Sequence, residues 1–252
     1  NFELVQAAAG YHFIMPMMCD KKPYDNLDTR LALKYAFNRQ KLVELMFGKF
    51  ARVGNDHPIP ESDPFHNNEL PQREYDPEKA LFHAKKAGLG TSDVILQASD
   101  AAFNGAIDMS VLFQATAAAA GINVTVKREP ADGFWDNVWL KAPFMTSYWG
   151  GRPAATQMLA VAYSASAPWN DTHWRVDAFE KLLADAKATT DQAKRKDYIW
   201  EMQRMLHEEG GALIPLFKDW LDVHDVKVKG HTPHGMFDLC NSRIVQKAWI
   251  EA

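Results

Sequence analysis

Tryptophan is the residue type in this sequence with the clearest capacity to bind a ligand, because its placement is uneven. Five of the eight tryptophans fall within residues 135–174. They are Trp135, Trp139, Trp149, Trp169 and Trp174. Indole rings can fill a core, or they can line a small-molecule cleft beside a few polar groups. We favour the cleft for Trp149 and Trp169, because each stands in a stretch rich in turn residues.

Two short loops carry these tryptophans next to small and polar residues. Trp149 ends an expected strand, and Trp169 follows a proline in an expected turn. In α/β proteins, ligands gather in the loops beyond the carboxyl ends of strands. The expected ligand-binding residues in the two loops and in the segment before them are Phe134, Trp135, Trp149, Gly150, Gly151, Arg152, Trp169, Asn170 and Asp171.

The sequence lacks the motifs of the common catalytic and nucleotide-binding sites. It contains no G-x-S-x-G elbow and no P-loop. Gly88-Leu89-Gly90 lies after a helix and before a strand, the reverse of a dinucleotide-binding turn, and is better explained as a helix end. His207 has no second histidine four residues away, and Pro233 breaks any helix that would align His231 with His234. We expect neither a cofactor nor a bound metal ion.

Three classes of function remain open on these residues. A binding protein needs aromatic and polar cleft residues without an acid–base pair, which is the pattern found. A hydrolase needs a carboxylate such as Asp132, Asp136 or Asp171 beside a histidine in one pocket, with shifted pKa values. A structural interaction module is favoured if the tryptophans are buried. The sequence favours the binding protein.

Composition excludes several other classes of protein. The 252 residues carry 28 basic and 32 acidic side chains, for a net charge of −4, and 47% are hydrophobic. This is the composition of a globular protein rather than a disordered one. The lack of a basic block argues against nucleic acid as a partner, and no apolar run reaches the roughly 18 residues of a membrane span. Cys19 and Cys240 can pair in a disulfide or remain two free thiols.

Strands and helices alternate along most of the chain, which indicates an α/β fold with helices on the faces of a mixed sheet. One helix begins at Asp76-Pro77, where the Asp can cap it and the Pro suits its first turn, and it ends at Gly88. Residues 28–47 form one helix, or two with a second start capped by Asn38. Residues 48–76 are proline-rich and predict a long loop over another part of the protein. The other expected elements are helices at 104–120, 176–188 and 191–209, and strands at 11–16, 94–98, 122–126, 144–149, 213–217 and 223–228.

Six segments together, in order along nearly the whole chain, resemble one family of proteins. They are residues 28–42, 54–60, 75–80, 119–122, 149–153 and 195–215. Each resembles a segment of the extracellular (periplasmic) solute receptors of ABC importers, in the family that binds dipeptides, oligopeptides and nickel. One such match would be weak evidence, but six in the family order are specific.

This resemblance implies a receptor that performs no chemistry. Members of the family close a small-molecule ligand between two lobes and deliver it to an ABC permease, so they lie in the periplasm or outside the cell. Because members are longer, residues 1–222 are expected to be their C-terminal ligand-binding lobe. Residues 223–252 are expected to return to the missing N-terminal lobe, and a signal peptide is expected outside this sequence.

The chain departs from the family in the loop after Trp149. Dipeptide-binding members resemble W-x-G-D there, with the Asp on the amine of the peptide, whereas this sequence has Arg152. Asp100 stands near the position where those members place an Arg for the carboxylate. We expect a ligand that brings an acidic or hydroxyl-rich group to Arg152, as an opine would, rather than a dipeptide in the standard pose. The alternative is that Arg152 pairs with Asp171 and points away from the ligand.

Overall fold

The centre of the molecule is a four-stranded antiparallel sheet, seen in a computed structural model that describes residues 1–89 and 94–251. The strands run in the order β3 (Ala51–Val53), β7 (Ala212–Lys218), β2 (His12–Pro16) and β6 (Ser147–Trp149). Every residue of β2 is buried, and so is every residue of β7 except the last. This burial explains why both strands have almost continuous apolar sequences.

The strand expected at 144–149 is shorter than predicted. Only its last three residues form β6, while Phe144 makes an isolated bridge to Met17. Gln97 of β4 (Val94–Ala98) bridges Met145 in the parallel sense. β4 itself pairs with β5 (Val124–Arg128) as a parallel pair. The β-structure is therefore mixed, as expected.

The helices after β2 begin at capping residues that the sequence contains. α1 (Leu27–Tyr35) ends before Asn38, whose side chain accepts a backbone N–H at 2.9 Å and starts α2 (Arg39–Met46). The stretch is thus two helices. α3 (Pro77–Ala87) starts at Asp76, which accepts a backbone N–H at 2.9 Å, and ends at Gly88 with φ of +68°. That left-handed conformation favours glycine, so the predicted helix end is confirmed; Gly90 lies outside the described residues.

The long loop expected at 48–76 holds a 3₁₀ turn at Gly48–Phe50 and the strand β3 before its irregular part. The irregular part lies against α8 (Gln192–Glu208), where the backbone N–H of Asn67 donates to Gln203 Oε1 at 2.9 Å. The expectation that this loop covers another part of the protein is confirmed.

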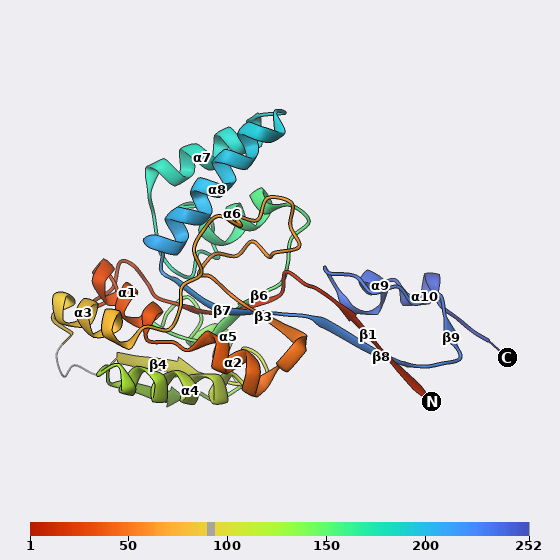
Figure 1. The fold of residues 1–252 in the computed structure, drawn as a ribbon, viewed down its shortest axis with the longest axis horizontal. Coiled ribbons are helices and arrows are strands. Elements are labelled where there is room, and N and C mark those ends of the chain that lie inside the picture. Colours follow the sequence, from red (N-terminus) through yellow and green to blue (C-terminus); the bar gives the residue numbers. More distant parts are fainter. Residues whose placement is uncertain (90–93, 252) are drawn as a thin grey trace.

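Helices cover both sides of the central sheet (Figure 1). On one side, α4 (Ala106–Ala119) lies on the β4–β5 pair and shares a core with α1 and α3. On the other side, α6 (Ala155–Tyr163), α7 (Asp177–Ala188) and α8 enclose a second core. The helices at α4, α7 and α8 agree with prediction within a few residues, whereas α6 was not predicted.

A two-stranded ribbon leaves the lobe at one side, and both chain ends lie on that side (Figure 1). It pairs β1 (Phe2–Ala7) with β8 (Trp220–Asp225) in the antiparallel sense. The strand expected at 223–228 therefore starts at Trp220, and a turn at 226–227 separates it from β9 (Val228–Lys229). The remaining elements are short: α5 (Phe134–Asn137) earlier in the chain, and α9 (Asp238–Ser242), α10 (Ile244–Lys247) and β10 (Trp249–Ile250) at its end.

Two further expectations are decided by the fold. Within the described part of the chain, no helix combines the length and the apolar character needed to cross a bilayer. Cys19 and Cys240 are both free thiols, so the disulfide alternative is not the one that forms.

Candidate ligand-binding site

Aromatic side chains from three parts of the chain surround a hollow of about 290 Å³, which we call the aromatic hollow. α5 and the turn after it supply Trp135 and Trp139, and β6 supplies Tyr148 and Trp149. Its lining residues are Trp135, Trp139, Tyr148, Trp149, Gly150, Arg152 and Trp169. The structure thus brings together five of the residues predicted from sequence, and it adds Trp139 and Tyr148.

The rings of the hollow contact one another edge to face or tilted rather than in a flat stack. Trp135 lies 5.7 Å from Trp139 and 5.7 Å from Tyr148 between ring centroids, at interplanar angles of 78° and 82°. On the facing loops, Trp149 and Trp169 are 6.3 Å apart. Trp149 is 5% exposed, whereas Trp169 is 46% exposed. Trp135 and Tyr148 are each 38% exposed. The hollow therefore combines one buried ring with three accessible ones, which differs from the fully buried set that a purely structural role would require.

Arg152 lines the same hollow with part of its guanidinium unengaged. Its Nη1 donates to the carbonyl oxygens of Gly150 at 2.9 Å and Gly151 at 3.1 Å, and the group lies 5.8 Å from the Trp149 ring. Within residues 1–89 and 94–251 it forms no ion pair, and its Nε and Nη2 make no hydrogen bond. The alternative that Arg152 pairs with Asp171 is not the arrangement found.

A buried histidine lies beneath this arginine. His12 on β2 pairs with Trp149 in the ladder, and its Nδ1 lies 3.0 Å from the carbonyl oxygen of Gly10. Complete burial lowers the pKa of His12 to about 4, and the nearby Arg152 acts in the same direction. The imidazole is therefore neutral at physiological pH, which leaves Arg152 as the positive charge at this point.

Asp171 lies behind the hollow and not in its lining. The side chain is fully buried, and its Oδ2 accepts hydrogen bonds from the indole N–H groups of Trp139 at 3.4 Å and Trp149 at 3.3 Å. Burial raises the pKa of Asp171 to about 7, although both indole bonds act to lower it. Its neighbour Asn170 is also buried, donating to the carbonyl oxygens of Ser164 and Trp174, so it shapes the loop rather than facing a ligand.

Phe134, Asp100 and Trp174 are not brought to the aromatic hollow. Phe134 is 1% exposed and belongs to the core beneath α4. Asp100 is exposed after the end of β4, where it accepts the backbone N–H of Ile107 at 3.2 Å. Trp174 packs on Phe179 in the second core at 5.3 Å. Asp100 and Arg152 therefore do not face each other across one hollow, because only Arg152 lines it.

A second hollow, of about 370 Å³, adjoins the first at Arg152, which lines both. Prolines of the 48–76 loop and Pro153 make up much of its wall. Gly151 lines it where the chain passes close to Gly10, since a Cβ on Gly151 would lie 3.2 Å from the Gly10 Cα. Close backbone approach thus gives Gly151 a packing role beside any contact with a ligand.

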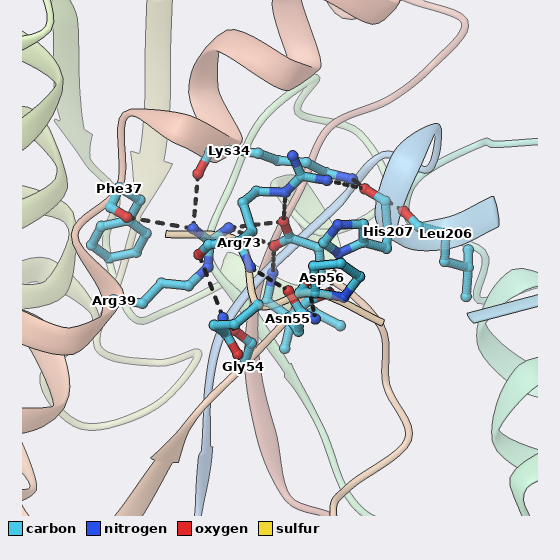
Figure 2. A network of polar contacts seen from close by, with 12 residues as sticks. Lys34, Phe37, Arg39, Gly54, Asn55, Asp56, Arg73, Leu206 and His207 are labelled. Atoms are coloured by element: carbon cyan, nitrogen blue, oxygen red, sulfur yellow. Dashed lines mark hydrogen bonds and ion pairs between the residues drawn. The ribbon is translucent and has the colours of Figure 1, made fainter. Parts of the chain in front are cut away.

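The strongest cluster of charges is structural and was not predicted (Figure 2). Asp56 accepts from Arg39 Nη2 at 2.7 Å and from Arg73 Nε at 2.9 Å, all three side chains being closed to solvent. Arg73 and Lys34 also donate to the carbonyl oxygen of His207 at the end of α8. Burial alone would raise the pKa of Asp56, but Arg39, Lys34 and Arg73 outweigh it and hold that pKa at about 2. The one signal in the sequence was Lys34, a lysine on the buried face of α1.

The pairing that a hydrolase needs is absent from the aromatic hollow. In the described part of the chain, the histidine–carboxylate pairs are His83–Asp28, His173–Asp20 and His231–Asp222. None of these residues lines the hollow. Asp171 has the raised pKa that marks many functional carboxylates, but its partners are two indole groups.

Comparison with known proteins identifies the family. Residues 1–171 match the family model described as bacterial extracellular solute-binding proteins, family 5 Middle. The chain belongs to this family. The resemblance inferred from the six segments is thereby confirmed.

Relatives of this family-5 chain are considerably longer. The dipeptide-binding protein of Escherichia coli (strain K12) is 27% identical over 226 residues, which is 84% of this chain and 41% of that protein. The glutathione-binding protein GsiB of Salmonella typhimurium (strain LT2) is 36% identical over 88 residues, or 35% of this chain and 17% of that protein. The family-5 chain thus spans less than half the length of these relatives.

Solved structures show the same fold. DppA from Helicobacter pylori in complex with the peptide STSA superposes with a TM-score of 0.86 at 21% identity, over 100% of this chain and 49% of that one. NikZ from Campylobacter jejuni in complex with Ni(L-His) gives 0.85 at 18% identity, over 98% and 53%. The family-5 chain has the α/β fold of one lobe of these two-lobed periplasmic binding proteins.

Proposed function

We propose that this protein is the substrate-binding component of an ABC import system and that it captures its ligand at the aromatic hollow. The observation that carries the proposal is Arg152, whose guanidinium lines the hollow without an ion pair to the described residues. A guanidinium without an ion pair can bind an anionic group of a ligand, because its planar shape allows two parallel hydrogen bonds to a carboxylate.

The ligand we propose is a small peptide-like or hydroxylated compound that carries an anionic group, such as an opine. The indole and phenol rings of the hollow can pack against an apolar or ring-shaped part of the ligand. Arg152 can bind the anionic group of the same ligand. The amine of a dipeptide has no matching carboxylate in the hollow, since Asp171 is buried behind two indole rings. The relative that binds glutathione supports an acidic peptide-like ligand, because glutathione carries two carboxylates.

A second lobe and a permease complete the proposed function. We propose that residues 1–222 form the ligand-binding lobe and that residues 223–252 pack on another lobe, which closes over the ligand outside the cytoplasm. Support comes from the length of the relatives and from apolar side chains left exposed on the ribbon and the C-terminal segment. Among these, Phe2 is 78%, Val245 is 90% and Ile250 is 77% exposed. No chemical step is part of this proposal.

A ligand screen of the full-length protein tests it. Thermal shift is measured with dipeptides, glutathione, opines and sugars, because a ligand that binds only the folded state raises the melting temperature. We expect acidic conjugates to raise it and simple neutral-side-chain dipeptides to leave it unchanged, with calorimetry to confirm each hit. A panel in which only dipeptides bind would contradict the proposed ligand class, and a turnover product from any of them would contradict the receptor.

A further inference from the structure

One carboxylate oxygen joins two walls of the aromatic hollow. Oδ2 of Asp171 is 3.4 Å from the indole nitrogen of Trp139, after α5, and 3.3 Å from that of Trp149, at the end of β6. The three residues come from separate parts of the chain. Both contacts are longer than the usual 2.7–3.2 Å of N–H···O hydrogen bonds, so they are weak as they stand, and a full negative charge on the acceptor would strengthen them.

The rest of this carboxyl group is unsatisfied. Oδ1 of Asp171 is buried and has no hydrogen-bond partner among the described residues, and the same holds for the hydroxyl of Tyr163, whose pKa is raised by burial and by the nearby Asp171. In the ion pairs of the described chain, Asp171 takes no part. An ionised carboxylate here is balanced by two indole dipoles and its own backbone N–H instead of a cation, which is costly in a buried place.

We propose that Asp171 is the positioning residue of the aromatic hollow, and that gain or loss of its proton resets the placement of Trp139 and Trp149. The ionised carboxylate holds both indole N–H groups on Oδ2. The protonated acid is a weaker acceptor than the carboxylate, so it releases the indole rings.

Asp171 gains or loses its proton within the physiological pH range. Burial raises the pKa of Asp171 to about 7, so both forms are populated at neutral pH. The groups that face it are the two indoles and the Tyr163 hydroxyl. The pKa of His12 on the neighbouring strand is lowered to about 4 by burial, so that residue stays neutral above pH 5. An effect of this protonation on ligand capture rests on the proposed function. The movement of Trp139 and Trp149 with the protonation of Asp171 does not depend on it.

Tryptophan fluorescence of the ligand-free full-length protein, titrated from pH 5 to 9, tests the inference. We expect the emission to change in one step with a midpoint near pH 7 in the wild type. Asp171→Asn keeps an acceptor oxygen but cannot ionise, so its emission should not titrate. Asp136→Asn, an exposed carboxylate on α5, and His173→Gln, a histidine close to Asp171 in sequence, should keep the step.

Single indole deletions separate a positioning role from a merely structural one. Trp139→Phe and Trp149→Phe each remove a donor that stabilises the ionised acid, so each should move the midpoint to higher pH. Trp135→Phe changes the same hollow without touching Asp171 and should leave the midpoint in place. If Asp171→Asn does not fold, these three variants decide the matter.

Two results would overturn the inference: a step that persists in Asp171→Asn, or an unshifted midpoint in both Trp139→Phe and Trp149→Phe. Because no ligand is present in these titrations, their failure leaves the proposed function standing. A receptor that binds none of the screened solutes would count against the proposed function alone.

Discussion

Arg39 and Asp56 form a closed ion pair, with Arg39 Nη2 at 2.7 Å from one carboxylate oxygen and 2.9 Å from the other. Arg39 is the first residue of α2, and Asp56 lies in the long loop after β3. The same carboxylate accepts the backbone N–H of Ile214 in β7 at 3.0 Å. One side chain therefore ties a helix, a loop and the central sheet together.

Asp56→Asn is expected to lower the free energy of unfolding by about 3 kcal/mol, because it leaves Arg39 and Arg73 buried without an opposite charge. Urea unfolding followed by circular dichroism measures this. Asp132→Asn, on an exposed loop position, is the matched control and should change stability little. A loss under about 1 kcal/mol in Asp56→Asn would show that this cluster does not stabilise the lobe.

Protonation of Asp56 should contribute to the unfolding of the wild type in acid. The pKa of Asp56 is held at about 2 in the folded protein against an ordinary 3.8. The unfolded state therefore binds a proton first as the pH falls, and the stability from this group is lost between about pH 4 and pH 2. The difference in unfolding free energy between wild type and Asp56→Asn should shrink across that window. A constant difference would contradict the low pKa.

Asp171 should have the opposite pH dependence. Its pKa is raised to about 7 from 3.8, so between these values the folded state keeps a proton that the unfolded state has released. The stability it contributes falls as pH rises, by about 1.4 kcal/mol per pH unit between these two values. Asp171→Asn should therefore gain stability relative to the wild type from pH 4 to 7 and hold a constant advantage above. Unfolding curves of both proteins at each pH would reveal a flat difference if this is wrong.

Arg152→Ala should weaken binding of an anionic ligand by roughly 10- to 100-fold, the range for losing a hydrogen bond to a charged group. Arg152→Lys should recover part of the loss, because lysine keeps the charge but not the fork. Calorimetry on the full-length protein gives both affinities. Arg175→Ala, an exposed residue outside the hollow, is the control and should bind normally. Unchanged affinity in Arg152→Ala would remove Arg152 from the site.

Gly54→Ala should destabilise the lobe by about 2 kcal/mol, since its Cβ would collide with the Ile214 carbonyl and lie 3.0 Å from the Leu216 nitrogen. These are backbone atoms of a central strand and cannot move aside. Gly48→Ala has open space around it and should cost only the strain of its φ of +53°, about 1 kcal/mol. Equal losses in the two variants would show that crowding at β7 is not the cause.

Local chemistry made several elements predictable. Asn38 and Asp76 cap helices by bonds to backbone N–H groups three residues ahead. Such contacts lie within one turn, so the sequence contains both partners side by side. α6 was missed because Ala154 offers no capping side chain and the helix is apolar around most of its surface. Without contrast between its faces, its period could not be recognised.

The residues of the hollow were predicted in part for the same reason. Trp149 is the last residue of a strand, and Gly150 and Arg152 follow it within three positions, so their loop could be placed. Phe134 and Trp135 are neighbours in sequence, but α5 turns one into the core and leaves the other 38% exposed. Which face of so short a helix is buried depends on what packs against it.

The sequence by itself determined the family, the α/β class and the loop that carries Arg152, because these rest on short segments in a fixed order. Only the tertiary structure decided what each charge does. Asp56 meets Ile214 across 158 positions, and Asp171 meets Trp139 and Trp149 across 32 and 22. Burial in the folded core then drives the pKa values of these two aspartates apart, since one lies among cations and the other beside indoles. The difference between these two pKa values depends on burial and on distances between residues that are far apart in the sequence, so it cannot be predicted from the order of residues alone.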